Sequence, residues 1–222
     1  MKIEIEAKVV VEDLKPISEA ARLAGAESRG TISQHDIYYS DPFGKLLKTG
    51  CGLRIRQQSG DVNRTILTFK GPVSKGPYKT RPEIEVEIGN RESMQQLMDG
   101  LGYQIVIEIR KKRQSWILGD CEVCLDEVEG LGRFVEVEGP NDEAITQTLR
   151  RIGLGEYVHI NRGYASMMME KMGINKITWG ATFGKAKPRF QRKPRPKGGH
   201  HKGKPRPFRR DDRKDRGPRD HH

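Results

Sequence analysis

The segment Ile3-Glu4-Ile5-Glu6-Ala7-Lys8-Val9 alternates apolar and charged residues, and this alternation decides the fold. In a β-strand successive side chains point to opposite faces, so one side of this strand is apolar and the other is charged. Paired glutamates return at Glu85 and Glu87 and again at Glu136 and Glu138. Taken singly, each strand fits an antiparallel sheet with an apolar inner face and a solvated outer face.

Four segments between or after these strands carry apolar residues at helical spacing. They lie at residues 13–24, 91–101, 142–152 and 163–172, and Gly25, Gly102, Gly153 and Gly173 stand where C-terminal helix caps belong. Each amphipathic stripe needs an apolar surface to cover it. If the helices cover the apolar face of the sheet, the charged face must line a cavity inside a closed or nearly closed sheet.

The other strand-like segments place cations and carboxylates on different strands. The charged positions that share this alternation are Arg54, Arg56, Lys70, Arg81, Glu83, Glu85, Glu87, Lys111, Arg113, Asp126, Glu136 and Glu138. Carboxylates at such density repel one another unless divalent cations lie among them, and oxygen-only ligands suit Mg²⁺ or Mn²⁺. Arginine and lysine opposite them would bind phosphate oxygens. The pattern therefore predicts a polyphosphate site with metal ions.

Several short motifs, in this order, resemble those of the CYTH superfamily, whose members are also called triphosphate tunnel metalloenzymes. They are Glu4-x-Glu6-x-Lys8, His35-Asp36-x-Tyr38-Tyr39, Leu53-Arg54-Ile55-Arg56, Thr68-Phe69-Lys70-Gly71, Lys111-x-Arg113 and Leu131-Gly132-Arg133-Phe134-Val135-Glu136-Val137-Glu138. The resemblance covers residues 1–173. It implies an α+β fold in which an eight-stranded antiparallel β-barrel encloses a charged tunnel and helices pack outside.

Within the superfamily, the run from Gly119 to Gly132 and the His35-Asp36 stretch look most like class IV adenylyl cyclases. Such an enzyme converts ATP to cyclic AMP and pyrophosphate. Relatives with the same tunnel residues hydrolyse inorganic triphosphate, thiamine triphosphate or nucleotides, so a triphosphatase is the alternative. A non-catalytic protein that binds polyphosphate or nucleic acid is a third interpretation.

The resemblance also implies roles for single residues and a need for two divalent ions. It assigns metal binding to Glu4, Glu6, Asp126, Glu136 and Glu138, and phosphate binding to Lys8, Arg54, Arg56, Lys70, Arg81, Lys111 and Arg113. The catalytic set would be Lys8, Lys111 and Arg113, with Glu85 orienting a base or a water molecule. For each basic residue the simpler alternative is an ion pair in the tunnel wall.

The composition indicates one domain, residues 1–173, followed by a basic tail, residues 174–222. The tail holds 17 Lys and Arg against 4 Asp, a net charge of +13, whereas the rest of the chain carries −2. Its Pro, Gly, Lys, Arg and His content predicts disorder, with either contact to nucleic acid or another polyanion, or no dedicated partner. The whole-chain charge of +11 therefore says little about the domain.

The loop Gly71–Thr80 carries Lys75 and Lys79, and it fits either a basic flap over the tunnel or an ordinary hairpin connection. Cys121 and Cys124 have redox or zinc spacing, but they fall in a strand-like run where core packing is the better interpretation. With no disulfide framework and no long apolar span, we expect a cytoplasmic protein without membrane contact. A homodimer is also expected from the resemblance.

Overall fold

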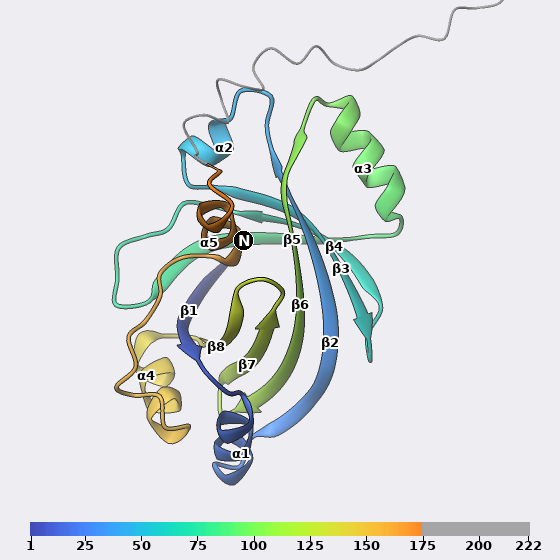
Figure 1. The fold of residues 1–222 in the computed structure, drawn as a ribbon. Helices are drawn as coiled ribbons and strands as arrows, with labels where there is room; N and C mark the ends of the chain where they lie inside the picture. The colour runs from blue at the N-terminus through green and yellow to red at the C-terminus, as the bar shows by residue number, and fades with distance from the viewer. Residues whose placement is uncertain (175–222) are drawn as a thin grey trace, which may run out of the picture. The chain divides into compact units, whose positions relative to one another are not determined.

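The computed structural model describes residues 1–174, and eight strands form a single sheet in this part of the chain. The strands are β1 (Lys2–Val11), β2 (Glu27–Ser40), β3 (Gly52–Gly60), β4 (Arg64–Lys70), β5 (Lys79–Ile88), β6 (Gln104–Leu118), β7 (Cys121–Val128) and β8 (Gly132–Glu138). Their order is β1-β5-β4-β3-β2-β6-β7-β8, and β8 pairs with β1, so the sheet closes (Figure 1). Every pairing is antiparallel. The predicted barrel is confirmed.

Five helices accompany the barrel: α1 (Lys15–Leu23), α2 (Lys45–Lys48), α3 (Arg91–Gly100), α4 (Asp142–Arg151) and α5 (Tyr164–Lys171). Four of them agree with the predicted segments to within a few residues. The single turn of α2 went unpredicted because it is too short to show a helical period. Gly25, Gly102, Gly153 and Gly173 all adopt positive φ after their helices, as the cap prediction required.

Asparagine side chains fix the starts of two of these helices. The Asn90 side chain accepts a hydrogen bond from Ser93 N at 2.7 Å, and Asn141 accepts one from Ala144 N at 2.9 Å. Each bond satisfies a backbone N–H that has no partner within its helix. The caps therefore set the points at which α3 and α4 leave the strands before them.

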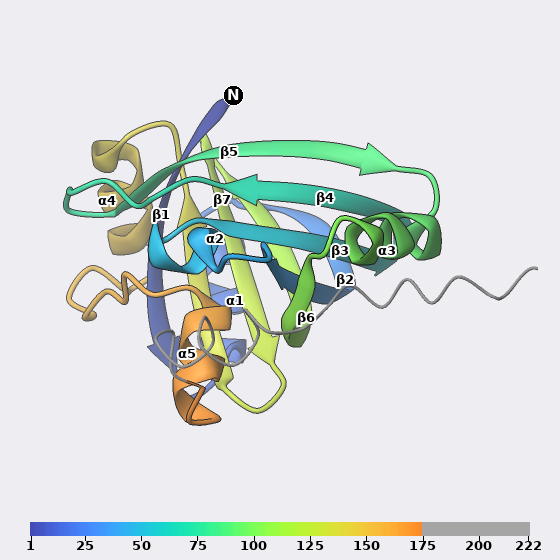
Figure 2. The same ribbon diagram turned by 90° about the horizontal axis from the view of Figure 1, so that it is seen from above.

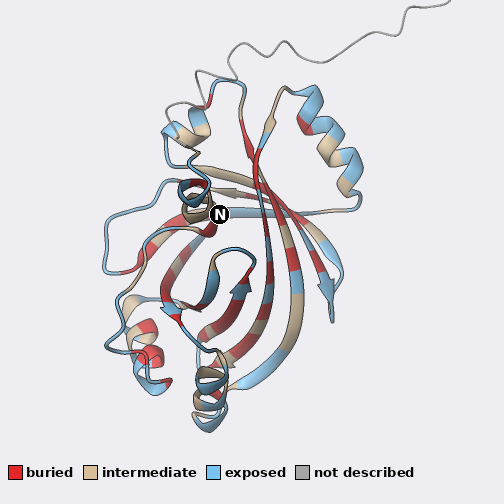
Figure 3. Cartoon of the chain, viewed as in Figure 1, coloured by how far each residue is buried: buried red, intermediate tan, exposed pale blue. Residues whose placement is uncertain are grey.

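Helices α1 and α4 cover the outer face of one half of the barrel. Their buried residues, Ala21, Ile145, Leu149 and Ile152, pack with outward-facing residues of β1, β6, β7 and β8 such as Val9, Val123 and Val135. Helix α3 covers β2 and β3 in the same way through Met94 and Met98. Figure 2 shows helices beside the sheet, and in Figure 3 buried residues follow the strands while the helices carry many exposed residues.

Helix α5 differs from the three helices that cover the outside. It packs with Ile107, Ile109, Val128 and Phe134. Residues paired directly across an antiparallel ladder share a face, and Ile109 pairs with Asp36 while Phe134 pairs with Asp126. These apolar residues therefore face the barrel interior, and α5 covers the interior at one end of the tunnel.

The loop between β4 and β5 is shorter than the sequence indicated. Strand β5 begins at Lys79, which pairs with Glu6 of β1 and is buried. Lys79 is therefore part of the tunnel wall and does not belong to an exposed flap. Lys79, Arg81 and Glu83 stand at every second position of β5 and therefore share its inward face.

Within residues 1–174 no helix combines the length and the apolar character that crossing a membrane requires. Cys121 and Cys124 are both buried and carry free thiols, which agrees with the core-packing interpretation. The predicted tail falls outside the described residues except for Ile174, which packs in the cluster under α5.

The contact between α4 and the barrel depends on the absence of a side chain at Gly139. A Cβ atom there would lie 2.7 Å from Cys121 Sγ and 2.9 Å from Ile145 Cγ1, closer than such atoms can approach. We expect Gly139→Ala to lower the free energy of unfolding by about 1–3 kcal/mol, since overpacking a core costs that much.

Chemical denaturation followed by circular dichroism measures this change. Gly89→Ala is the matched control, because a Cβ atom at Gly89 meets nothing within 4 Å and its φ is not positive. Equal stabilities of the two variants would contradict the packing argument.

Candidate active site

The barrel encloses a cavity of about 740 Å³, and many of the residues that line it are charged. The inward residues follow from the register, because Glu6 pairs with both Lys79 and Glu138, and Lys8 pairs with Glu136. Most of these side chains are buried although they carry charge. Buried charge is tolerated only when other groups compensate it, so the pairing of these residues is the central question.

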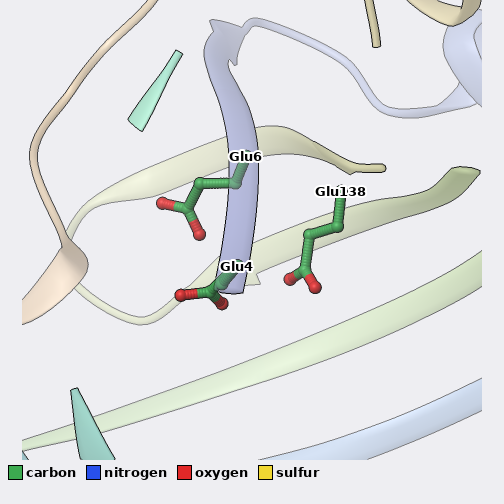
Figure 4. A group of neighbouring side chains, drawn as sticks. All are labelled: Glu4, Glu6 and Glu138. Atoms are coloured by element: carbon green, nitrogen blue, oxygen red, sulfur yellow. The ribbon is translucent and has the colours of Figure 1, made fainter. Parts of the chain in front are cut away.

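Three carboxylates gather on one side of the tunnel. Glu4 and Glu6 of β1 and Glu138 of β8 each offer an oxygen, and these oxygens lie within 4.8 Å of one another. Figure 4 shows the three side chains turned toward the same space. The donor set is oxygen only and anionic, which is the chemistry that Mg²⁺ and Mn²⁺ prefer. These residues therefore fit the metal ions that the sequence implied.

Two lysines neutralise part of this cluster. Lys70 Nζ lies 2.7 Å from Glu4 Oε2 and 2.9 Å from Glu83 Oε2, and Lys79 Nζ donates a hydrogen bond to Glu6 Oε1. Glu138 forms no ion pair within the described residues. Burial, the negative charge of Glu4 and then that of Glu6 raise the pKa of Glu138 to about 7. The cluster thus has fewer positive charges beside it than its carboxylates require.

A second group of charges surrounds Asp126, whose side chain is fully buried. Arg113 donates to both of its oxygens, at 2.7 Å from Nε to Oδ1 and 2.6 Å from Nη2 to Oδ2, and Lys111 Nζ donates to Oδ2 at 2.8 Å. Arg113 also binds Glu136. Burial alone would raise the pKa of Asp126, but Arg113 and Lys111 outweigh it and hold that pKa below the ordinary value. Asp126 is therefore a charged partner of two cations.

Lys8 links the tunnel to the segment before α5. Its Nζ lies 2.9 Å from Glu136 Oε1, 3.5 Å from Glu6 Oε1 and 3.0 Å from the carbonyl oxygen of Arg162. Although burial would lower the pKa of Lys8, Glu136 and Glu6 raise it above the ordinary lysine value. Lys8 therefore stays positively charged, and its three N–H groups already have acceptors.

Tyr164, the first residue of α5, reaches the same group. Its hydroxyl donates to Asp126 Oδ2 at 2.8 Å. Lys8 Nζ lies 4.3 Å and Lys111 Nζ 4.9 Å from the centre of its ring, within the range of cation–π attraction. One aromatic side chain thus contacts two cations and the carboxylate between them.

The third charged group joins β2 and β3. Arg56 binds Asp36 with two hydrogen bonds, of 2.6 Å from Nε and 2.7 Å from Nη2, and Arg54 Nη1 lies 3.3 Å from Asp36 Oδ2. Burial would raise the pKa of Asp36, but Arg56 and Arg54 outweigh it and lower that pKa well below the usual range. Arg54 also approaches Glu83 and Glu85, each at 3.7 Å. Its Nε is buried without a partner among the described residues.

Arg81 forms no ion pair among the described residues, and Glu85 reaches the third group only through Arg54, at 3.7 Å. Arg81 donates to the backbone carbonyl oxygens of Gly50, Lys70 and Gly71 and so ties together the ends of strands around the tunnel. The Glu85 side chain is 46% exposed and accepts a hydrogen bond of 3.0 Å from Thr68 Oγ1. Arg81 is thus held by the backbone, and Glu85 lies near an opening of the tunnel.

The structure brings the predicted metal ligands into two places. Glu4, Glu6 and Glu138 meet in the cluster, whereas Asp126 and Glu136 lie among cations. Sequence reasoning assigned no role in the site to Asp36 or Tyr164, and it placed Lys79 in a loop that would be a basic flap or an ordinary hairpin. The sequence carried a signal for two of them, because Asp36 belongs to the motif His35-Asp36-x-Tyr38-Tyr39 and Lys79 continues the alternation of charged residues in β5. Tyr164 had none, because its place in the tunnel depends on how α5 returns to the barrel.

Comparisons with known proteins agree with this fold. Residues 2–164 match the CYTH domain. The chain is 38% identical over 136 residues to "Putative adenylate cyclase MJ0240" of Methanocaldococcus jannaschii, covering 61% of this chain and 76% of that protein. It is 26% identical over 185 residues to "Adenylate cyclase CyaB" of Aeromonas hydrophila, covering 78% and 93%.

Among solved structures, the PH1819 protein from Pyrococcus horikoshii is 33% identical, with a TM-score of 0.67 over 76% of this chain and 99% of that one. The fold and the matched domain thus agree over nearly all of the described residues. On the strength of the closed charged barrel and the domain match over residues 2–164, this chain belongs to the CYTH family.

Proposed function

We propose that the protein is a metal-dependent enzyme that acts on a triphosphate in the tunnel, and that it converts ATP to cyclic AMP and pyrophosphate. The observation that carries the proposal is the three-carboxylate cluster of Glu4, Glu6 and Glu138 inside a cavity otherwise rich in lysine and arginine. The adenylate cyclase activity is supported by the names of the 38% and 26% identical relatives.

Glu4, Glu6 and Glu138 would hold the metal. We assign Asp126 and Glu136 to positioning the lysine and arginine side chains beside it. Divalent ions bound here would offset the charge of the phosphate oxygens and of departing pyrophosphate. Lys70 and Lys79 now hold Glu4 and Glu6. A metal ion held by Glu4 and Glu6 would leave the two ammonium groups available to phosphate oxygens.

The arginines orient the phosphate chain. Arg54 and Arg56 project from β3, and Arg113 projects from β6, which only β2 separates from β3. An aspartate steadies each arginine. A guanidinium group presents two N–H donors in one plane and so fixes the rotation of a phosphate as well as its position. Lys8 of β1 and Lys111 of β6 add positive charge to the same cavity.

In the reaction the ribose 3′-oxygen forms a bond to the α-phosphorus, and the bond from that phosphorus to the bridging oxygen breaks. Pyrophosphate leaves with the bonding electrons, and the hydroxyl proton passes to a base or to water. We assign Glu85 to orient this proton acceptor, because its carboxylate is half exposed and is held by Thr68. Phosphoryl transfer of this kind depends mainly on positioning and on charge stabilisation.

The test is product analysis after incubation of the full chain with Mg²⁺ or Mn²⁺ and with ATP, tripolyphosphate or thiamine triphosphate in separate reactions. We expect cyclic AMP and pyrophosphate in equal amounts from ATP. Orthophosphate without a cyclic product would replace the cyclase with a triphosphatase. Absence of turnover with all three substrates would reject an enzyme of either kind.

Removing the charge of two cluster residues tests the metal site. We expect Glu4→Gln combined with Glu6→Gln to reduce metal-dependent turnover at least about a hundredfold, because most of the anionic ligand set is lost. The variant should keep the circular dichroism spectrum of the barrel, since glutamine preserves shape. Glu127→Gln, on the exposed face of β7, is the matched control and should retain activity. Normal turnover of the double variant would place the metal elsewhere.

The raised pKa of Glu138 predicts how metal binding depends on pH. Below about pH 7 the metal-free protein holds a proton on Glu138, and a metal ion must displace that proton. The apparent affinity for Mn²⁺ should therefore rise up to about tenfold per pH unit up to pH 7 and then level off. Isothermal titration calorimetry between pH 5.5 and 8.5 measures this. A flat profile over that range would show that Glu138 is already ionised at pH 5.5.

A further inference from the structure

The tunnel wall changes from charged to uncharged along two neighbouring strands. On β3 the inward residues run from Arg54 and Arg56 to Gln58, and on β2 the residue that follows the Asp36 layer is Gln34. Gln34 pairs directly with Gln58, so the two amides lie side by side on the same wall of the cavity. On their other side Ile32 and Gln34 pair with Arg113 and Lys111 of β6. The arginines of β3 therefore border a second compartment, which has uncharged side chains on β2 and β3 and cations on β6.

Apolar residues complete this compartment. Ile32 follows Gln34 on β2, and Ile66 lies opposite Arg56 on β4; both line the cavity. Arg64, two residues before Ile66, is exposed and marks an opening of the tunnel. A ligand that fills the charged layer with phosphates could extend past Ile32 and Ile66 toward this opening.

One atom in this compartment lacks a partner. The Gln34 side chain is buried, with 4% of the residue exposed, and its Oε1 accepts no hydrogen bond from the described residues. The neighbouring Gln58 differs, because its Oε1 accepts a hydrogen bond of 2.5 Å from Arg64 Nε. A buried acceptor without a donor is costly, so a bound ligand that supplies a donor there gains affinity.

The missing partner identifies the class of ligand. The oxygens of an ionised triphosphate accept hydrogen bonds and donate none, so inorganic triphosphate leaves Gln34 Oε1 unsatisfied. A flat heterocycle with an amino group beside a ring nitrogen satisfies both ends of a glutamine amide, as adenine does when a protein reads its edge. Ile32 and Ile66 supply the apolar surface that such a ring requires.

We propose that the Gln34 compartment binds a 4-aminopyrimidine edge, the chemistry that adenine and thiamine share. The amino group donates to Gln34 Oε1, and the adjacent ring nitrogen accepts from Gln34 Nε2. This inference rests on the proposed function, because the phosphates of the same ligand must occupy the neighbouring charged layer. It assigns the organic half of the substrate to residues of β2, β3 and β4.

Binding measurements test the compartment separately from turnover. Dissociation constants are measured by calorimetry with the full chain and Mg²⁺ for ATP, inosine triphosphate, thiamine triphosphate and tripolyphosphate, and chromatography verifies that the ligand is intact. Inosine carries an oxygen where adenine carries the amino group. We expect ATP to bind about tenfold more tightly than inosine triphosphate.

Variants assign this preference to the compartment. Gln34→Met keeps the length of the side chain but removes the amide, and the preference for ATP over inosine triphosphate should fall close to one. Gln58→Met provides a second probe in case the first variant folds poorly. Ser33→Ala, on the exposed outer face of β2, is the matched control and should keep the wild-type ratio.

The outcomes distinguish adenine from thiamine as the ligand. They also distinguish a failure of the Gln34 compartment from a failure of the proposed function. If Gln34→Met weakens the binding of ATP but not that of thiamine triphosphate, the ligand is adenine. If it weakens only the binding of thiamine triphosphate, the ligand is thiamine. Either result supports the compartment. Equal binding of ATP and inosine triphosphate, together with no effect of Gln34→Met on thiamine triphosphate, overturns it even if tripolyphosphate binds well. Failure of tripolyphosphate and every other ligand to bind overturns the proposed function as well.

Discussion

Compensation of buried charge is the constraint on which the rest of this structure depends. A closed sheet with charged residues on its inner face removes many ions from water, and an unpaired ion there would cost several kcal/mol. The chain meets this requirement by placing cations and carboxylates on different strands. Asp126 receives Arg113 and Lys111, Asp36 receives Arg56 and Arg54, and Glu4 receives Lys70. The cluster with Glu138 is where compensation is weakest, and that is where a divalent cation fits.

The apolar side of the same strands explains the helices. Because the interior is polar, the hydrophobic core must lie between the barrel and its covering helices, and α1, α3 and α4 provide it. Helix α5 has a different task. It covers inward-facing apolar residues at one end of the tunnel and brings Tyr164 to Lys8, Lys111 and Asp126. The charged interior is thereby bounded by an apolar layer at that end.

The strand alternation, in which Glu4 and Glu6 alternate with Ile3 and Ile5, predicted a closed sheet with charged residues inside only in combination with the amphipathic helices that must cover its apolar face. The motifs then supplied the number of strands and the family. What the sequence could not show was the pairing of charges. That Glu138 joins Glu4 and Glu6 while Glu136, two residues earlier, faces Lys8 and Arg113 depends on the register of β8 against β1. Tyr164 and Gln34 were missed because their surroundings come from distant segments.

The closure of the barrel has a consequence for folding. β1 pairs with β5 on one side and with β8 on the other, so the strand that carries Glu4 and Glu6 lies beside the strand that carries Glu138 although the two are the first and last strands in the sequence. Contacts so distant in sequence form slowly. The metal cluster therefore spans the seam that joins the first and last strands of the sheet. A partly folded chain, however much of its secondary structure is in place, lacks the complete ligand set, and high-affinity metal uptake would report that the seam has closed.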